Sequence, residues 1–206
     1  MMGKLKKLTG YRLFLPLSCL IIVLLINLIT TPTFFRITIN NGVLYGYIID
    51  VINRASELVV LAVGMTLVVS ASAGTDISVG AVMAVAASVC THVLAGGEVS
   101  VNEYANPYVL AVLAALAAAV VCGGFNGLLV AKLKIQPMVA TLILFTAGRG
   151  ISQLVTNGQI TYIRVDGYKL LGNNIPGIPI PTPIFVAVIV VALTYILLKK
   201  TAMGMY

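Results

Sequence analysis

The chain has 206 residues, of which 60% are hydrophobic and 9% charged, and its formal net charge is +7. Soluble domains carry about 25% charged residues, so this composition excludes an ordinary soluble domain. A membrane-spanning helix needs roughly 20 mostly apolar residues. We therefore expect one transmembrane domain over residues 1–206, with no room for a separate soluble domain.

The first apolar stretch covers residues 13–30 and follows a lysine-rich flank. A basic flank ahead of an apolar run also occurs in signal peptides. The stretch is followed by TPTFF and not by the small-residue pattern of a cleavage site. We interpret it as an uncleaved first span.

The next segment, INNGVLYGYIIDVINRA, has apolar residues at helical spacing, among them Ile48, Val51 and Ile52. Such a face suits a helix lying flat on the outer membrane surface. An ordinary loop packed on the protein explains the segment equally well, so both interpretations stay open.

Five further apolar stretches follow, at residues 57–73, 78–94, 108–130, 138–155 and 183–198. Polar or Gly- and Pro-rich segments separate most of them. The pattern predicts an all-α fold, a polytopic transmembrane helical bundle of about six spans.

The charged residues divide unequally between the two predicted sides. With the N-terminus in the cytoplasm, the inner segments hold no acid and eight bases: Lys4, Lys6, Lys7, Arg12, Lys132, Lys134, Lys199 and Lys200. The outer segments hold four bases, Arg36, Arg54, Arg164 and Lys169, and five acids, Asp50, Glu57, Glu98, Glu103 and Asp166. Cytoplasmic loops are enriched in Lys and Arg, so we predict a cytoplasmic N-terminus. The net charge is then a topology signal, and nucleic acid is not an expected partner.

One acid lies within the apolar zone, in the tight inner turn SAGTDISVG. Gly74 and Gly80 flank Asp76, and glycine frees the backbone from helical geometry, which predicts a broken helix. Asp76 can cap the N-terminus of the third span, where it also meets the positive end of the helix dipole. Acids inside membranes are also functional candidates, so Asp76 and Ser78 are candidates for the substrate pathway or its gate. The two roles can coexist.

The fourth span carries small residues at helical spacing, and Gly123 and Gly127 form a small-xxx-small step that favours close helix packing. Asn126 on this helix needs a polar partner, either across a helix interface or in a cavity lining the pathway. Pro137 follows in the tight turn KIQP and suits the first turn of the next helix.

Arg149 lies between two glycines in the fifth span. It can reach the outer interface, pair with Asp76 or line the pathway. Its residue count places it nearer the outer face than Asp76, which disfavours a direct pair.

Several chemistries have no support in the sequence. The three cysteines lie in apolar segments without metal-ligand spacing, and the one histidine lies near a helix end. No phosphate-binding glycine loop with Lys and Ser or Thr occurs, nor does a nucleophile motif. We expect no catalytic residue, no metal and no cofactor.

These motifs, in this order, resemble the membrane permease of the ribose- and galactofuranose-type sugar ABC importers. The matching segments are VINRASELVVLAVGMTLVVSASAGTDISVGAVMAVAA, FNGLLVAKLKIQPMVATLILFTAGRGISQLVTNGQI and KKTAMGMY. The galactofuranose permease is the member that IIDVINRA, KIQPMVATLI and AGRGISQL resemble most. The turn departs mildly from the usual family pattern at two positions: Ala73 replaces a glycine, and Thr75 replaces an isoleucine.

The resemblance implies a multi-pass permease of the bacterial inner membrane that binds no ATP itself. Its expected partners are the lipid bilayer, a second permease copy or homologue, a cytoplasmic sugar-type ATPase and a periplasmic sugar-binding protein. Family members continue past GMY into a coupling segment and further spans. We therefore expect the chain to be the N-terminal part of a permease, unable alone to couple to ATP hydrolysis.

Two other classes of function remain open at this point. An ion-coupled secondary transporter also uses broken helices, but no second break of this kind occurs at a matching position. A non-transporting membrane scaffold or truncated subunit would use the same small-residue faces.

Overall fold

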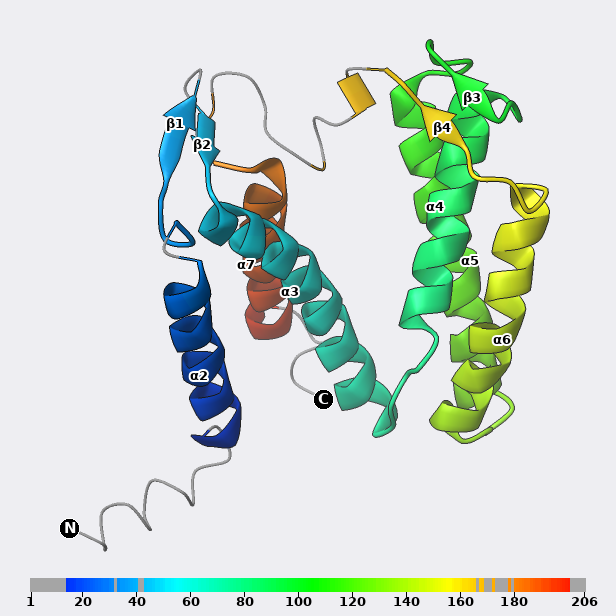
Figure 1. Ribbon diagram of the computed structural model, residues 1–206. Coiled ribbons are helices and arrows are strands. Elements are labelled where there is room, and N and C mark those ends of the chain that lie inside the picture. The colour runs from blue at the N-terminus through cyan, green and yellow to red at the C-terminus, as the bar shows by residue number, and fades with distance from the viewer. Residues whose placement is uncertain are drawn as a thin grey trace, which may run out of the picture.

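The computed structural model describes residues 14–31, 33–40, 43–165, 167–168, 172, 178 and 180–200. These residues form six helices and two small two-stranded sheets (Figure 1). The helices are α2 (Phe14–Thr30), α3 (Tyr47–Ser72), α4 (Val79–Ala95), α5 (Tyr108–Ala131), α6 (Pro137–Val155) and α7 (Thr182–Lys200). The predicted all-α polytopic bundle is confirmed.

Four of these helices, α3, α5, α6 and α7, are long and apolar enough to cross a membrane. The other two, α2 and α4, have 17 residues each, which is at the lower limit for a span. Most large apolar side chains on the helices are exposed, as expected for surfaces that face lipid or other helices.

The segment after the first span differs from both interpretations offered by its sequence. β1 (Thr38–Asn40) pairs antiparallel with β2 (Val43–Tyr45), with Thr38 opposite Tyr45. The chain then enters α3 at Tyr47, ten residues ahead of the predicted span, and continues without interruption to Ser72. The helical spacing therefore belongs to the first turns of the span itself, and the described residues form no separate surface helix there.

The helices form two groups (Figure 1). α3 packs along α7, while α4 packs on both α5 and α6, which also contact each other. Residues 73–78 connect the groups. A short parallel sheet of β3 (Ser100–Val101) and β4 (Tyr162–Ile163) joins the loop after α4 to the segment after α6. In the second group Val85, Cys122 and Leu144 form a small buried core.

The described helix ends that adjoin the predicted inner segments lie toward one end of the molecule. The start of α2, the connection between α3 and α4 and the α5–α6 turn are at the bottom of Figure 1, and α7 also ends in its lower half. Both strand pairs lie at the opposite end. This is the arrangement that the charge pattern requires of a polytopic bundle.

A close approach of α4 and α6 at Gly148 yields a stability prediction. A Cβ added at Gly148 would lie 3.1 Å from the Ala81 Cβ, whereas one at Gly150 would meet no atom within 4 Å. Gly148→Leu is expected to destabilise the α4–α6 pair by about 1–3 kcal/mol through overpacking. Gly150→Leu is the matched control and should unfold at or above the wild-type temperature, because leucine favours helix. Thermal unfolding of the detergent-purified protein measures both, and equal midpoints would contradict the packing.

Candidate functional site

The break between α3 and α4 is built against the start of α6. Ala73 ends α3 in the left-handed conformation, with φ of 51°. Gly74 follows, and a Cβ added there would lie 2.7 Å from two ring carbons of Pro137, the first residue of α6. Gly80, also expected at the break, already lies within α4 with open space around it. Of these two glycines, only Gly74 lies so close to another residue that a side chain would not fit.

Asp76 has local partners. Its Oδ1 accepts hydrogen bonds from the Ser78 backbone N–H and from Ser78 Oγ, both at 2.7 Å. The amide bond satisfies an N–H immediately ahead of α4, in the manner of an Asx turn. Asp76 thus stabilises the entry to the helix, although Ser78 itself occupies the N-cap position.

A hydrogen-bonded chain connects this turn to α5 and α6. The Asn126 amide Nδ2 on α5 donates to Ser78 Oγ at 2.8 Å, and Ser78 is completely buried. The Ile77 N–H donates to Thr141 Oγ1 on α6 at 3.2 Å. Asn126 is 7% exposed, and its Oδ1 has no partner among the described residues.

A cavity of about 450 Å³ adjoins this chain. It lies between the end of α3 and the facing parts of α5 and α6, and Ser72, Asp76, Asn126 and Thr141 supply its polar wall. We call it the inner cavity, after the predicted orientation. Gly123, Gly127 and Pro137 also line it.

Gly123 and Gly127 have no described atom within 4 Å of an added Cβ. No described helix packs closely on them, so their role in close packing stays a prediction. Arg149 is exposed, and its guanidinium carbon lies 4.4 Å from the centre of the Phe145 ring. Within the described ranges it forms no ion pair with Asp76, and its place in a pathway stays a prediction.

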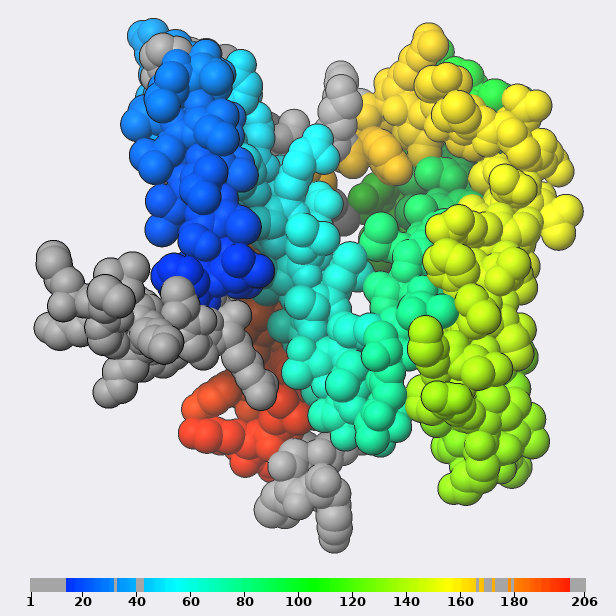
Figure 2. Space-filling view, turned by 60° about the horizontal axis from the view of Figure 1, so that its bottom comes forward, coloured from blue at the N-terminus to red at the C-terminus, as the bar shows by residue number. Residues whose placement is uncertain are grey.

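A second cavity, of about 660 Å³, lies at the opposite end of the same two helix groups. One wall is the polar face of α3, where Asp50, Asn53, Arg54 and Glu57 recur at helical spacing. We call it the outer cavity. Figure 2 shows the surface hollowed between α3, in cyan, and the green and yellow helices.

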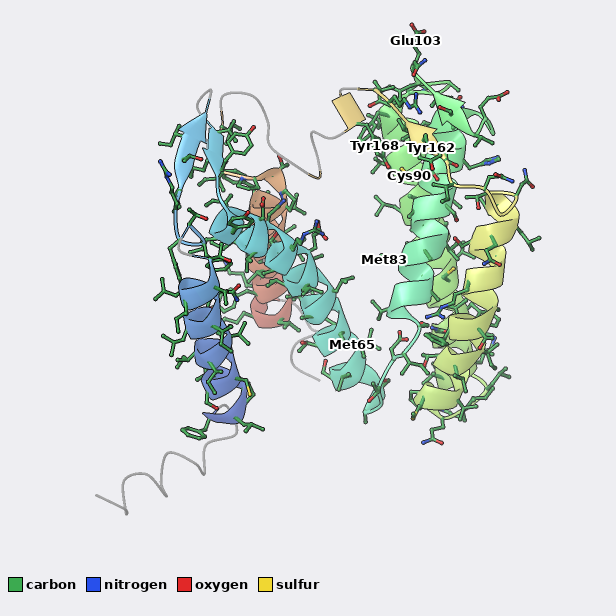
Figure 3. The ribbon with its side chains drawn as sticks, in the orientation of Figure 1. Met65, Met83, Cys90, Glu103, Tyr162 and Tyr168 are labelled. Atoms are coloured by element: carbon green, nitrogen blue, oxygen red, sulfur yellow. The ribbon has the colours of Figure 1, made fainter. Side chains whose placement is uncertain are left out.

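The opposite wall of the outer cavity comes from three other segments. Cys90 on α4, Tyr108 at the start of α5 and Tyr168 line it, and Figure 3 places Cys90 and Tyr168 close together at this end of α4. The Tyr108 and Tyr168 rings meet edge to face, with centroids 6.5 Å apart. Burial, and to a smaller extent the nearby Cys90 and Tyr104, raise the pKa of the Tyr168 phenol. At neutral pH Tyr168 therefore remains a hydrogen-bond donor.

No site at this wall was predicted from the sequence. Asp50, Arg54 and Glu57 were interpreted only as charges on the outer side. Their spacing of three and four residues was the available signal, because it places them on one helix face. Recognising a site also required the facing tyrosines, which lie over fifty residues away in the chain.

Comparisons with known proteins agree on a transport permease, while the names of the matches differ in the transported compound. A family model described as the permease component of the branched-chain amino acid transport system matches residues 47–206. The galactofuranose transporter permease protein YtfT of Escherichia coli is 42% identical over 92% of this chain and 53% of its own length. The fructose import permease protein FruF of Bifidobacterium longum is 36% identical over 97% of this chain and 55% of its own.

A third relative is the ribose import permease protein RbsC of Haemophilus influenzae, 34% identical over 91% of this chain and 54% of its own. The chain therefore spans about half the length of the curated relatives it matches. No solved structure matches the chain.

Proposed function

The chain belongs to the family of permease components of the branched-chain amino acid transport system, and we propose that it forms part of the permease of an ATP-driven sugar importer. The resemblance predicted from its motifs is confirmed by this family and by the sugar permeases among its relatives. Its apolar helices and its relatives make it a multi-pass protein of the inner membrane. Galactofuranose, fructose and ribose are named for three of these relatives. The proposed cargo is accordingly a monosaccharide.

One structural observation supports a transport route most directly. Both cavities lie between the same helix groups, with α3 on one side and α4, α5 or α6 on the other. Their α3 walls are centred near residues 53 and 70, which separates them by about 25 Å at a rise of 1.5 Å per residue. That distance approaches the thickness of the hydrocarbon core, about 30 Å.

The segment between the cavities is apolar. Met65 lies on α3 and Met83 on α4, and Met83 is two helical turns from Cys90 on the same helix (Figure 3). Methionine is flexible and adapts its shape to a passing ligand. We propose that sugar moves from the outer cavity past these methionines to the inner cavity as the two groups change their separation across residues 73–78.

The proposed partners follow from the family. They are a second permease copy or homologue, a cytoplasmic ABC ATPase that hydrolyses ATP, and a periplasmic binding protein that delivers the sugar. The chain itself would contribute no catalytic residue. Asp76, Ser78, Asn126 and Arg149 remain candidates for the pathway or gate, with the first three already hydrogen-bonded at the inner cavity.

Reconstituted transport tests this function. The complete permease, its ATPase and its binding protein are placed in proteoliposomes, and uptake of labelled ribose, fructose and galactose is measured. We expect uptake of at least one sugar to require ATP and to persist when ionophores dissipate ion gradients. Uptake that ignores ATP and stops with the gradient would instead show an ion-coupled transporter. A third outcome would show a scaffold: the proteoliposomes take up no sugar, and cells from which the chain is deleted transport sugar as before.

A further inference from the structure

We propose that the outer cavity is itself a binding site for a neutral polyhydroxyl sugar, so that the permease adds a selection step of its own. The inference rests on the proposed function and deepens it by assigning the ligand's contacts. Asn53 and Glu57 on α3 and the tyrosines opposite them are the residues that would contact the sugar.

The first argument is the concentration of polar groups. The chain is 9% charged, yet Asp50, Arg54 and Glu57 lie within eight residues on one face of a helix whose remaining turns are largely apolar. All three side chains are exposed, so water or a ligand in the cavity can reach them. Within the described ranges these three form no ion pair with one another, so their hydrogen-bonding capacity is available to a ligand in the cavity.

Asn53 adds a second, independent observation. Its Oδ1 is buried and has no hydrogen-bond partner among the described residues, although Asn53 lines the cavity. Leaving a buried acceptor unpaired costs about 1–3 kcal/mol. Rotation of the Asn53 side chain that brings Oδ1 to the cavity wall would let a ligand hydroxyl donate to it, which removes that cost.

The mixture of donors and acceptors fits hydroxyl groups. Asp50 and Glu57 accept hydrogen bonds, Arg54 donates them, and Asn53 and the tyrosine hydroxyls do both. Each sugar hydroxyl also donates and accepts. The volume of about 660 Å³ lies within the roughly 300–1,000 Å³ typical of small-molecule sites.

Other ligand classes fit less well. A branched-chain amino acid needs an aliphatic pocket for its side chain, and among the described residues no Val, Leu or Ile lines this cavity. Among the described lining residues, a sugar phosphate or other anion would meet two acids and one base, a net negative wall. The described residues contain no group of His, Cys, Asp and Glu suited to a metal ion.

Cys90 provides a reporter inside the cavity. Of the other cysteines, Cys19 is exposed on α2 and Cys122 is buried. Cys19→Ala and Cys122→Ala, with any further cysteine of the complete permease also replaced, leave Cys90 as the only thiol. The rate at which a small water-soluble methanethiosulfonate modifies Cys90 is measured in the assembled transporter, with ribose, fructose, galactose or leucine.

We expect at least one sugar to slow the modification several-fold and saturably, and leucine to have no effect. Asn53→Ala and Glu57→Gln should each raise the sugar concentration for half-protection about tenfold, the loss of one good hydrogen bond. In the absence of sugar, both variants should leave the rate of Cys90 modification unchanged, which shows that the cavity remains folded. Glu103→Gln is the matched control, because Glu103 lies in an exposed loop at the same end and points away from the cavity (Figure 3).

Three outcomes would each overturn the inference. Cys90 could fail to react with the reagent, leucine but no sugar could protect it, or sugar could protect it fully in both α3 variants. Sugar uptake by the same single-cysteine protein is measured in parallel. ATP-dependent uptake without protection of Cys90 would refute the binding site and leave the proposed function standing. Absent or ATP-independent uptake would refute the function itself.

Discussion

Asp76→Ala is expected to destabilise the protein by about 2–4 kcal/mol, because it removes the acceptor of two hydrogen bonds. The Ser78 N–H and Ser78 Oγ both donate to Asp76 Oδ1, and Ser78 is completely buried. Water therefore has poor access to replace the lost acceptor. Asp76→Asn keeps an Oδ1 acceptor and should retain the fold. Thermal unfolding in detergent measures the difference.

The same two variants, Asp76→Ala and Asp76→Asn, show whether transport requires the hydrogen bonds of this side chain or its negative charge. If Asp76→Asn folds and transports sugar normally, hydrogen bonding by the side chain is sufficient. If it folds but fails to transport, the ionised carboxylate is required. An Asp76→Ala protein that unfolds at the wild-type temperature would contradict the structural role.

A double-mutant cycle provides the control for this network. Ser78 lies between Asp76 and Asn126 in the hydrogen-bonded chain. Ser78→Ala should therefore reduce the effect of Asp76→Ala, with a coupling energy of about 0.5–3 kcal/mol. Thr91→Ala removes a half-buried hydroxyl on α4 that bonds only its own helix, and it should show no coupling to Asp76.

Gly74→Ala is expected to destabilise the protein by about 1–3 kcal/mol through a steric clash. The added Cβ would lie 2.7 Å from Cβ and Cγ of Pro137. These ring atoms cannot rotate away, so the start of α6 or the break itself must shift. Because both border the inner cavity, we expect transport to fall as well.

Gly80→Ala is the matched control for this substitution. It lies six residues along the chain, inside α4, and has no atom within 4 Å of an added Cβ. Alanine favours helix over glycine by about 1 kcal/mol, so Gly80→Ala should be neutral or stabilising. The packing would be wrong if both variants had the same unfolding midpoint in detergent.

Much of the fold was predictable from local patterns. Each of the six apolar stretches corresponds to a helix, and five of them begin within a residue of the prediction. The broken helix at Asp76 was also predicted, from Gly74 and Gly80, although Gly80 lies inside α4. The exception was α3, which begins at Tyr47, because the charged residues Asp50 and Arg54 in its first turns interrupt the apolar stretch.

The sequence by itself determined the membrane class, the helices and the position of the break, because each depends on the apolar character or backbone freedom of neighbouring residues. Tertiary structure decided which side chains meet. Asn126 reaches Ser78 across 48 residues, and the polar face of α3 lies opposite Tyr108 and Tyr168 only because the two helix groups stand side by side. Such contacts depend on helix packing between distant segments, which no local pattern specifies.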